Sequence, residues 1–133
     1  MLDTNILVYV LNASPRHEAV LARFDRVDPQ DMVISSITLA ELRYGIEKSR
    51  RLEANRRALN RVLRAFNVLA FDVKAAETYG AVRAGLESVG KPAGPLDTLI
   101  AAHALALNLT LVTNNVREFS LVRGLRVENW VSG

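Results

Sequence analysis

The stretch GPLDTLIAAHALALNLTLVTNN, residues 94–115, contains both kinds of element from which the chain is built. The proline and the long apolar run after it predict a helix from Leu96 to Leu109. Residues 110–113 predict a short buried strand, and the two asparagines that follow are typical of a turn. One acidic residue, Asp97, lies in the first turn of this otherwise apolar helix.

The same alternation of short apolar strands and helices continues through the rest of the chain. We expect strands at residues 1–3, 32–35, 68–71, 110–113 and 126–128. We expect helices at residues 6–11, 16–27, 36–48, 52–66, 73–89 and 96–109, with a turn at Ser14-Pro15. Short, continuously apolar strands that alternate with helices are typical of a parallel sheet covered on both faces. The sequence therefore predicts an α/β fold.

The composition predicts one globular domain that spans residues 1–133. Half of the residues are hydrophobic and 23% are charged, which argues against a disordered chain. The absence of cysteine excludes a disulfide framework and suits a reducing compartment, so we expect a cytoplasmic protein. No apolar run is long enough to span a bilayer, and we expect no membrane association. The net charge of +3 and the pI of about 9.7 permit an anionic partner.

Three acidic residues, Asp3, Glu41 and Asp97, stand in apolar segments, where an unpaired carboxylate is costly. None of them has an obvious basic partner nearby in the sequence, so we infer one cluster that binds a divalent cation. The carboxyl ends of parallel strands share one edge of a sheet, where ligands bind. Asp3 and Asn115 would each follow a strand at that edge. Oxygen ligands favour hard cations, which indicates Mg²⁺ or Mn²⁺.

Each of these acidic residues also has a purely structural explanation. Asp3 lies in a strand-to-helix turn, where an aspartate often caps the helix. Glu41 could be a solvated residue that pairs with Arg43 or Lys48. Asp97 could simply complement the positive end of its helix.

Capping residues are also expected at two helix starts. Thr4 or Asn5 is suited to cap the first helix, and Ser36 is suited to cap the helix that contains Glu41.

Taken in order, these segments resemble the PIN-domain family, and more narrowly the VapC toxins of bacterial toxin–antitoxin pairs. The match covers nearly the whole chain. It depends on Leu2-Asp3-Thr4-Asn5-Ile6, Ser35-Ser36-Ile37-Thr38-Leu39-Ala40-Glu41-Leu42-x-x-Gly45, Asp97-x-Leu99-Ile100-Ala101-Ala102-x-Ala104, Val112-Thr113-Asn114-Asn115 with Phe119, and Gly124-Leu125-Arg126-Val127-Glu128-Asn129-Trp130.

The resemblance implies a three-layer α/β/α fold with a short central parallel sheet of four to five strands. It also implies a Mg²⁺- or Mn²⁺-dependent endoribonuclease that hydrolyses RNA in line and leaves a 5′-phosphate and a 3′-hydroxyl. By position, Asp3, Glu41 and Asp97 match the catalytic, metal-binding acids. Asn115 matches the fourth catalytic position, which is often aspartate, and the uncharged amide leaves Glu118 as an alternative. The residues that would orient these groups or the substrate are Thr4, Asn5, Ser36 and Thr113.

The resemblance further implies partners. A VapB-type antitoxin would wrap the toxin and direct a basic residue towards the acids, in a toxin–antitoxin hetero-oligomer. The early apolar residues could form its groove, although ordinary core packing also explains them: Val8, Tyr9, Leu11, Leu39 and Leu42. A homodimer is expected as well, with the apolar helix from Ile100 to Leu107 as a candidate contact.

Arginines recur at helical spacing in one region and form a stripe, Arg50, Arg57, Arg61 and Arg64. Such a stripe is suited to contact RNA phosphates. The alternative is a solvated face whose charge is balanced by Glu47 and Glu53. The family resemblance and the small number of aromatic residues favour a structured RNA, and a tRNA in particular, as substrate.

Two other functions are weighed against the nuclease. A non-catalytic PIN-like protein-interaction module would be consistent with Asn115, but would have no need for three costly carboxylates. An acid–base ribonuclease without a metal would need histidines. His17 is expected at the surface and His103 is expected to be packed among apolar residues.

Overall fold

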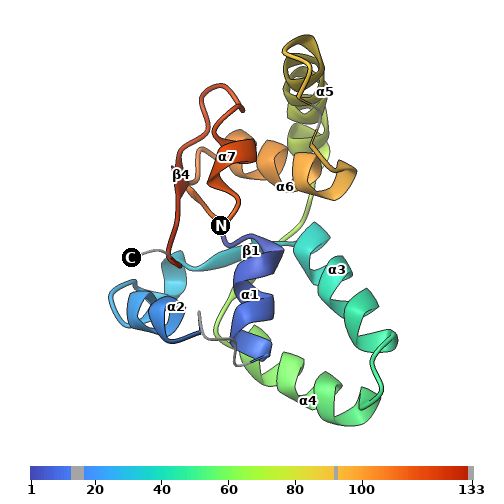
Figure 1. Ribbon diagram of the computed structural model, residues 1–133, viewed down its shortest axis with the longest axis vertical. Coiled ribbons are helices and arrows are strands. Elements are labelled where there is room, and N and C mark those ends of the chain that lie inside the picture. The colour runs from blue at the N-terminus through green and yellow to red at the C-terminus, as the bar shows by residue number, and fades with distance from the viewer. Residues whose placement is uncertain (13–16, 92, 132–133) are drawn as a thin grey trace.

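Short parallel strands form the centre of the computed structural model, which describes residues 1–12, 17–91 and 93–131 (Figure 1). The strands are β1 (Val33–Ser35), β2 (Asn67–Leu69), β3 (Leu111–Val112) and β4 (Val127–Glu128). The helices are α1 (Thr4–Leu11), α2 (His17–Phe24), the 3₁₀ turn η1 (Pro29–Asp31), α3 (Ser36–Glu47), α4 (Leu52–Leu63), α5 (Val73–Ser88), α6 (Pro95–Ala106) and α7 (Val116–Phe119).

The first three residues of the chain join two pairs of strands into one parallel arrangement. β1 pairs with β2, and β3 pairs with β4. The Leu2 N–H donates to the Val33 carbonyl at 2.9 Å, and the Asp3 N–H donates to the Val112 carbonyl at 2.8 Å. The spatial order is therefore β2, β1, residues 1–3, β3, β4. In such an order the direction of winding reverses beside residues 1–3, and ligands bind outside the carboxyl ends of strands at this switch point.

Alternating side chains of the strands divide the core into two layers. Leu2, Ile34 and Val112 pack with the helices α1 to α4. Val33 and Leu111 point to the opposite face and pack with α5, α6 and α7. Figure 1 accordingly shows α5 to α7 on one side of the strands and α1 to α4 on the other. This is the three-layer α/β/α fold with parallel strands that the sequence predicts.

A polar contact fixes the junction between β1 and α3, the helix that carries Glu41. The Ser35 hydroxyl accepts the Ile37 N–H at 3.0 Å and so caps α3. The same hydroxyl lies 2.8 Å from Nδ1 of His103 on α6. His103 is 1% exposed and stacks edge-on against Phe71. The expected packed position of His103 is confirmed, and its imidazole links α6 to the start of α3.

Two capping assignments made from the sequence are wrong. Asp3, rather than Thr4 or Asn5, caps α1, because its carboxylate accepts the Thr4 N–H at 2.8 Å. The structural explanation given for Asp3, that it caps this helix, is thereby confirmed. Ser35, rather than Ser36, caps α3. In both cases the helix begins directly after the last residue of the preceding strand segment, so that last residue is the N-cap.

The element boundaries mostly agree with the sequence to within a few residues. The turn expected at Asn114 and Asn115 leads directly into the short helix α7. The turn expected at Ser14-Pro15 and the start of the second helix at Arg16 lie outside the described residues. Within the described ranges, no helix is both long and apolar enough to cross a membrane.

Substituting Ser35 with alanine should destabilise the protein by about 2–4 kcal/mol. It removes an N-cap, at about 1 kcal/mol, and leaves the buried imidazole without a partner, at about 1–3 kcal/mol. Urea denaturation measures the change. Ser88→Ala is a matched control, because Ser88 is exposed and its hydroxyl bonds only to Gly85 within α5. Equal stabilities of the two variants would contradict the role assigned to Ser35.

Candidate active site

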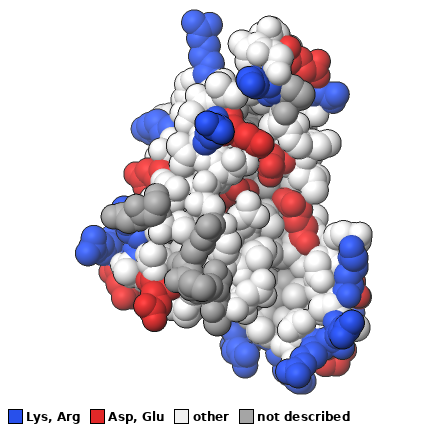
Figure 2. Space-filling view, in the orientation of Figure 1, with Lys and Arg blue, Asp and Glu red and all other residues white. Residues whose placement is uncertain are grey.

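Four acidic side chains reach the edge of the sheet where the winding reverses. Asp3 ends the N-terminal strand segment, Glu41 lies in the second turn of α3, Asp97 lies in the first turn of α6, and Glu118 lies on α7. Figure 2 shows acidic surface near the centre of the visible face, between α7 and α3. Basic surface gathers at the edge of the same face, over α4 and the end of α3.

Asp3 is buried and is held by two donors from different elements. It is only 2% exposed. One carboxylate oxygen accepts the Thr4 N–H, and the other accepts the Thr113 hydroxyl at 2.8 Å. The Thr113 hydroxyl in turn accepts the Asn115 N–H at 2.9 Å. Burial raises the pKa of Asp3, the two hydrogen bonds oppose this effect, and the charge of Glu41 adds to it. The two hydrogen bonds therefore hold the Asp3 carboxylate in one orientation, but both donors are uncharged and do not neutralise it.

Glu41 is tied to α1 rather than to a basic residue. Its carboxylate accepts the Thr4 hydroxyl at 2.8 Å, and the Thr38 hydroxyl lies 3.3 Å from that of Thr4. The alternative of a solvated pair with Arg43 or Lys48 is wrong. Arg43 donates instead to Asn60, and the Lys48 ammonium lies over a neighbouring aromatic ring.

Thr38 was not anticipated from the sequence. It looks like an ordinary helix residue there, and only the fold brings its hydroxyl beside Thr4 of another helix.

Asp97 is half-buried and takes part in no ion pair within the described residues. Burial raises the pKa of Asp97 to about 6, and the negative charges of Asp3, Glu41 and Glu118 add to the effect. α6 is capped by Gly94 without a side-chain bond, so Asp97 is not a capping residue. Three carboxylates from separate parts of the chain therefore act electrostatically on Asp97.

Asn115 and Glu118 act together. The Asn115 side-chain amide donates to the Glu118 carboxylate at 2.8 Å. An amide that donates in this way directs Glu118, whose charge acts on Asp97. Of these two residues, Glu118 is the one that adds a negative charge to the cluster.

The remaining residues expected at the site are less directly connected to it. Asn5 is exposed. The Ser36 hydroxyl accepts the Phe71 N–H at 3.0 Å and so joins α3 to the end of β2. His17, which was expected at the surface, is half-buried at the start of α2, a helix that carries none of the four acids. Burial lowers the pKa of His103 and thereby keeps its ring neutral, which suits packing rather than acid–base chemistry.

The arginine stripe on and before α4 is exposed, and no ion pair in the described part of the chain includes its members, Arg50, Arg57, Arg61 and Arg64. Glu47 and Glu53 pair with Arg56 instead, at 2.6 and 3.0 Å. The expected neutralisation of the stripe by these two acids is therefore wrong.

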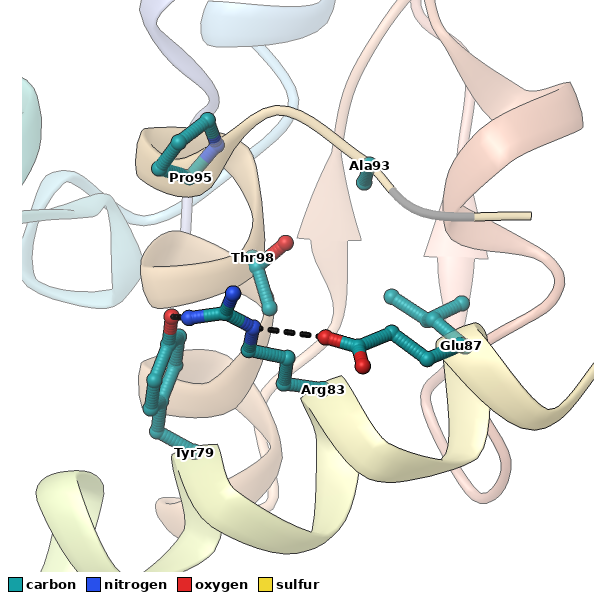
Figure 3. A pocket seen from close by; sticks show the side chains of 7 residues that line it. Tyr79, Arg83, Glu87, Ala93, Pro95 and Thr98 are labelled. Atoms are coloured by element: carbon teal, nitrogen blue, oxygen red, sulfur yellow. Dashed lines mark hydrogen bonds and ion pairs between the residues drawn. The ribbon is translucent and has the colours of Figure 1, made fainter. Parts of the chain in front are cut away.

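Two hollows lie beside helices that carry acids of the cluster. The larger, of about 290 Å³, is a groove between α1, α3 and α4, with Thr4 and Glu41 at one end. Its apolar lining includes Val8, Leu11 and Leu42. The smaller, of about 80 Å³, lies between α5 and α6 (Figure 3).

In the smaller hollow the Arg83 guanidinium lies between Tyr79 and Glu87 and donates to both, at 3.2 and 2.8 Å. These three polar side chains, which line this hollow, are thus hydrogen-bonded to one another.

The candidate dimer contact at Ile100 to Leu107 is largely core. The side chains of residues 100–104 are buried, and Leu107 is exposed at the end of the stretch. Most of this helix is therefore not accessible to a second copy.

The donor set suits a hard divalent cation. It consists of carboxylate oxygens, with hydroxyl and amide groups that orient them, and no Lys or Arg of the described chain pairs with Asp3, Glu41 or Asp97. In the described residues no three acidic or histidine side chains already stand in ligating positions.

Comparison with known proteins gives consistent matches. A family model for the PIN domain matches residues 1–125. The tRNA(fMet)-specific endonuclease VapC of Shigella flexneri is 44% identical over 130 residues, which cover 98% of this chain and 96% of that protein. Ribonuclease VapC2 of Rickettsia felis is 42% identical over 134 residues, with coverage of 98% and 96%.

Solved structures are similar as well. VapBC from Salmonella typhimurium, bound to DNA, contains a chain that superposes with a TM-score of 0.91 at 42% identity, covering 98% of this chain and 96% of that one. VapBC2 from Rickettsia felis, bound to a DNA fragment from its promoter, gives a TM-score of 0.88 at 42% identity, with coverage of 98% and 97%.

Asp97→Asn should stabilise the metal-free protein near neutral pH. Between the unfolded-state pKa of about 3.9 and the folded-state pKa of about 6, the folded chain keeps a proton that the unfolded chain releases. The free energy of unfolding therefore falls as pH rises through this window, and the full penalty applies above it. After allowance for solvent screening, the variant should gain roughly 1–3 kcal/mol at neutral pH and little near pH 4.

Thermal melts in EDTA at several pH values measure this effect. Asp25→Asn is a matched control, because Asp25 is exposed and is not one of the acids of the cluster. A stability gain in Asp97→Asn that does not depend on pH would contradict the explanation.

Proposed function

The chain belongs to the PIN-domain family, and on that premise we propose that it is a VapC-type ribonuclease toxin that needs Mg²⁺ or Mn²⁺. The observation that carries the proposal is the meeting of Asp3, Glu41, Asp97 and Glu118 at one sheet edge without a basic counterpart among the described residues. A protein keeps such a cluster at a cost in stability, and perturbed carboxylates of this kind are typical of functional sites.

Asp3, Glu41 and Asp97 would hold the ion, with Glu118 as the fourth acidic group. When bound, a divalent cation supplies a nucleophilic water at neutral pH and offsets the charge that develops on the scissile phosphate. Asp97 is the best placed to orient the attacking water, because it is the least tied of the three acids. In-line attack would leave a 5′-phosphate and a 3′-hydroxyl.

Hydroxyl groups position these acids. Thr113 directs Asp3, and Thr4 directs Glu41. Groups of this kind fix the orientation of a carboxylate and tune its affinity for a cation. Asn115 has the same relation to Glu118.

RNA is the substrate we propose, and a tRNA in particular, since the relative from Shigella flexneri is named for a tRNA. The exposed arginines Arg50, Arg57, Arg61 and Arg64 are free of ion pairs in the described chain and would contact its phosphates. These contacts would hold the structured RNA against the protein so that one of its phosphates reaches the acidic cluster.

The partner we propose is a VapB-type antitoxin, as in the VapBC complexes to which the chain is similar. The groove between α1, α3 and α4 has an apolar lining that suits an antitoxin segment, and it leads to Thr4 and Glu41. A homodimer within a larger hetero-oligomer remains part of the proposal.

A non-catalytic interaction module is the alternative, and its argument is the uncharged Asn115. The Asn115 side chain is hydrogen-bonded to Glu118, so an acidic group lies beside Asn115 although Asn115 itself is uncharged. No observation therefore favours the alternative.

Cleavage of a labelled tRNA should require added Mg²⁺ or Mn²⁺ and should stop in EDTA. Asp97→Asn should lower the rate by about 100- to 1,000-fold, because several kcal/mol of transition-state stabilisation depend on the cation. Denaturing gels measure the products, and circular dichroism checks that the variant is folded. Full activity in EDTA, or in a folded Asp97→Asn protein, would refute the proposal.

Glu118→Gln should raise the Mg²⁺ concentration needed for half-maximal cleavage by about 10- to 100-fold. Asn115→Ala should have a smaller effect, because Asn115 acts by directing Glu118. Glu77→Gln is the control, since Glu77 is an exposed acid on α5. A large effect of Asn115→Ala combined with none for Glu118→Gln would make Asn115 the fourth group instead.

A further inference from the structure

Tyr44 is an aromatic residue that the core does not use. It is 65% exposed and is the only aromatic among the strongly exposed large hydrophobic side chains of the described residues. The other two tyrosines are half-exposed and have engaged hydroxyls: that of Tyr9 accepts from Asn114 at 3.0 Å, and that of Tyr79 accepts from Arg83 beside the smaller hollow (Figure 3). An aromatic ring left in solvent gains nothing for folding, so it points to a role at the surface.

Tyr44 lies on the same side of α3 as the acidic cluster. Glu41, Tyr44 and Lys48 are spaced at i, i+3 and i+7, which places them along one side of the helix. The Lys48 ammonium lies 5.1 Å from the centre of the Tyr44 ring. An exposed ring and a cation therefore stand one turn beyond Glu41.

This pair has the chemistry of a nucleotide contact. Aromatic rings stack on unpaired bases. A neighbouring ammonium can contact the phosphate of that nucleotide or the base that stacks on the ring. We propose that Tyr44 and Lys48 form a stacking site for one unpaired base of the RNA, next to the scissile phosphate. The proposal rests on the proposed ribonuclease function and adds a preference for RNA with an unpaired base at that place.

The position of Tyr44 argues against two other binding partners for the ring, an antitoxin segment and a second copy of the chain. On α3 the groove proposed for the antitoxin is lined by Glu41, Leu42, Gly45, Ile46 and Ser49. Glu41 borders both the groove and the side of Tyr44, and Tyr44 is not part of the groove lining. The exposed residues beside Tyr44 on this helix include Arg43, Glu47 and Lys48, so no continuous apolar patch surrounds the ring for a second copy of the chain.

The test measures RNA binding separately from cleavage. A labelled hairpin RNA is titrated with Asp97→Asn protein in Mg²⁺, with and without the additional change Y44A, and fluorescence anisotropy gives Kd. Y44A should weaken binding by about 5- to 100-fold. Y44F keeps the ring and should recover most of the binding. K48M should weaken binding less than Y44A and should reduce its salt dependence.

Abasic RNAs identify stacking. Each loop nucleotide is replaced in turn by an abasic residue, and at one position Y44A should cause no further loss, because the base it would stack on is missing. An equal loss from Y44A with every abasic RNA, or no loss at all, would overturn the proposal. A change in sedimentation of Y44A without a change in RNA binding would assign the ring to contact between copies and would also overturn it.

The outcome is distinguishable from failure of the nuclease proposal. If the unchanged protein cuts no RNA in Mg²⁺ but Y44A still weakens binding at one nucleotide, the stacking site stands and the nuclease function fails. If the unchanged protein cuts RNA and Y44A binds as well as its parent, only the stacking site fails.

Discussion

Repulsion between carboxylates at one edge of a short parallel sheet is the constraint on which the rest of the structure depends. Asp3 is buried, Asp97 is half-buried, and the charges of Glu41 and Glu118 act on Asp97. The fold opposes the repulsion only in part, with a backbone N–H and hydroxyl groups that direct the acids without neutralising them. A cluster of this kind is stable when the rest of the core compensates and when a cation completes it.

The order of the strands explains why the acids meet. Residues 1–3 lie between β1 and β3, so the end of the first segment and the end of β3 are neighbours. Thr113 follows β3 and reaches Asp3 by a hydrogen bond across this position, although 110 residues separate them. α3 and α6 leave the sheet nearby, and His103 bonds to Ser35 at the start of α3. One buried contact between helices therefore helps to set the direction in which Glu41 and Asp97 approach.

The sequence predicts the alternating elements, the parallel sheet and its two covered faces, because periodicity and apolar runs are local properties. It also singles out Asp3, Glu41 and Asp97, because a charged residue in an apolar segment stands out without knowledge of the fold. It does not choose Ser35 over the adjacent Ser36 as the cap of α3, because that choice depends on where β1 ends. It does not identify Thr38 as a neighbour of Thr4, because that contact joins two separate helices. The hydrogen bond from the Asn115 amide to Glu118, across the first turn of α7, also becomes visible only in the structure.

The groove and the acidic cluster have Thr4 and Glu41 in common, and this overlap bears on how the proposed activity could be restrained. An antitoxin segment in the groove would lie against these two residues. A basic side chain on it could then offset the same repulsion that a divalent cation offsets, so that inhibitor and cation would compete for one electrostatic site. Tyr44 is exposed and does not line the groove, so a ligand confined to the groove would leave the ring exposed. Inhibition would then act on the acids first and on RNA binding only indirectly.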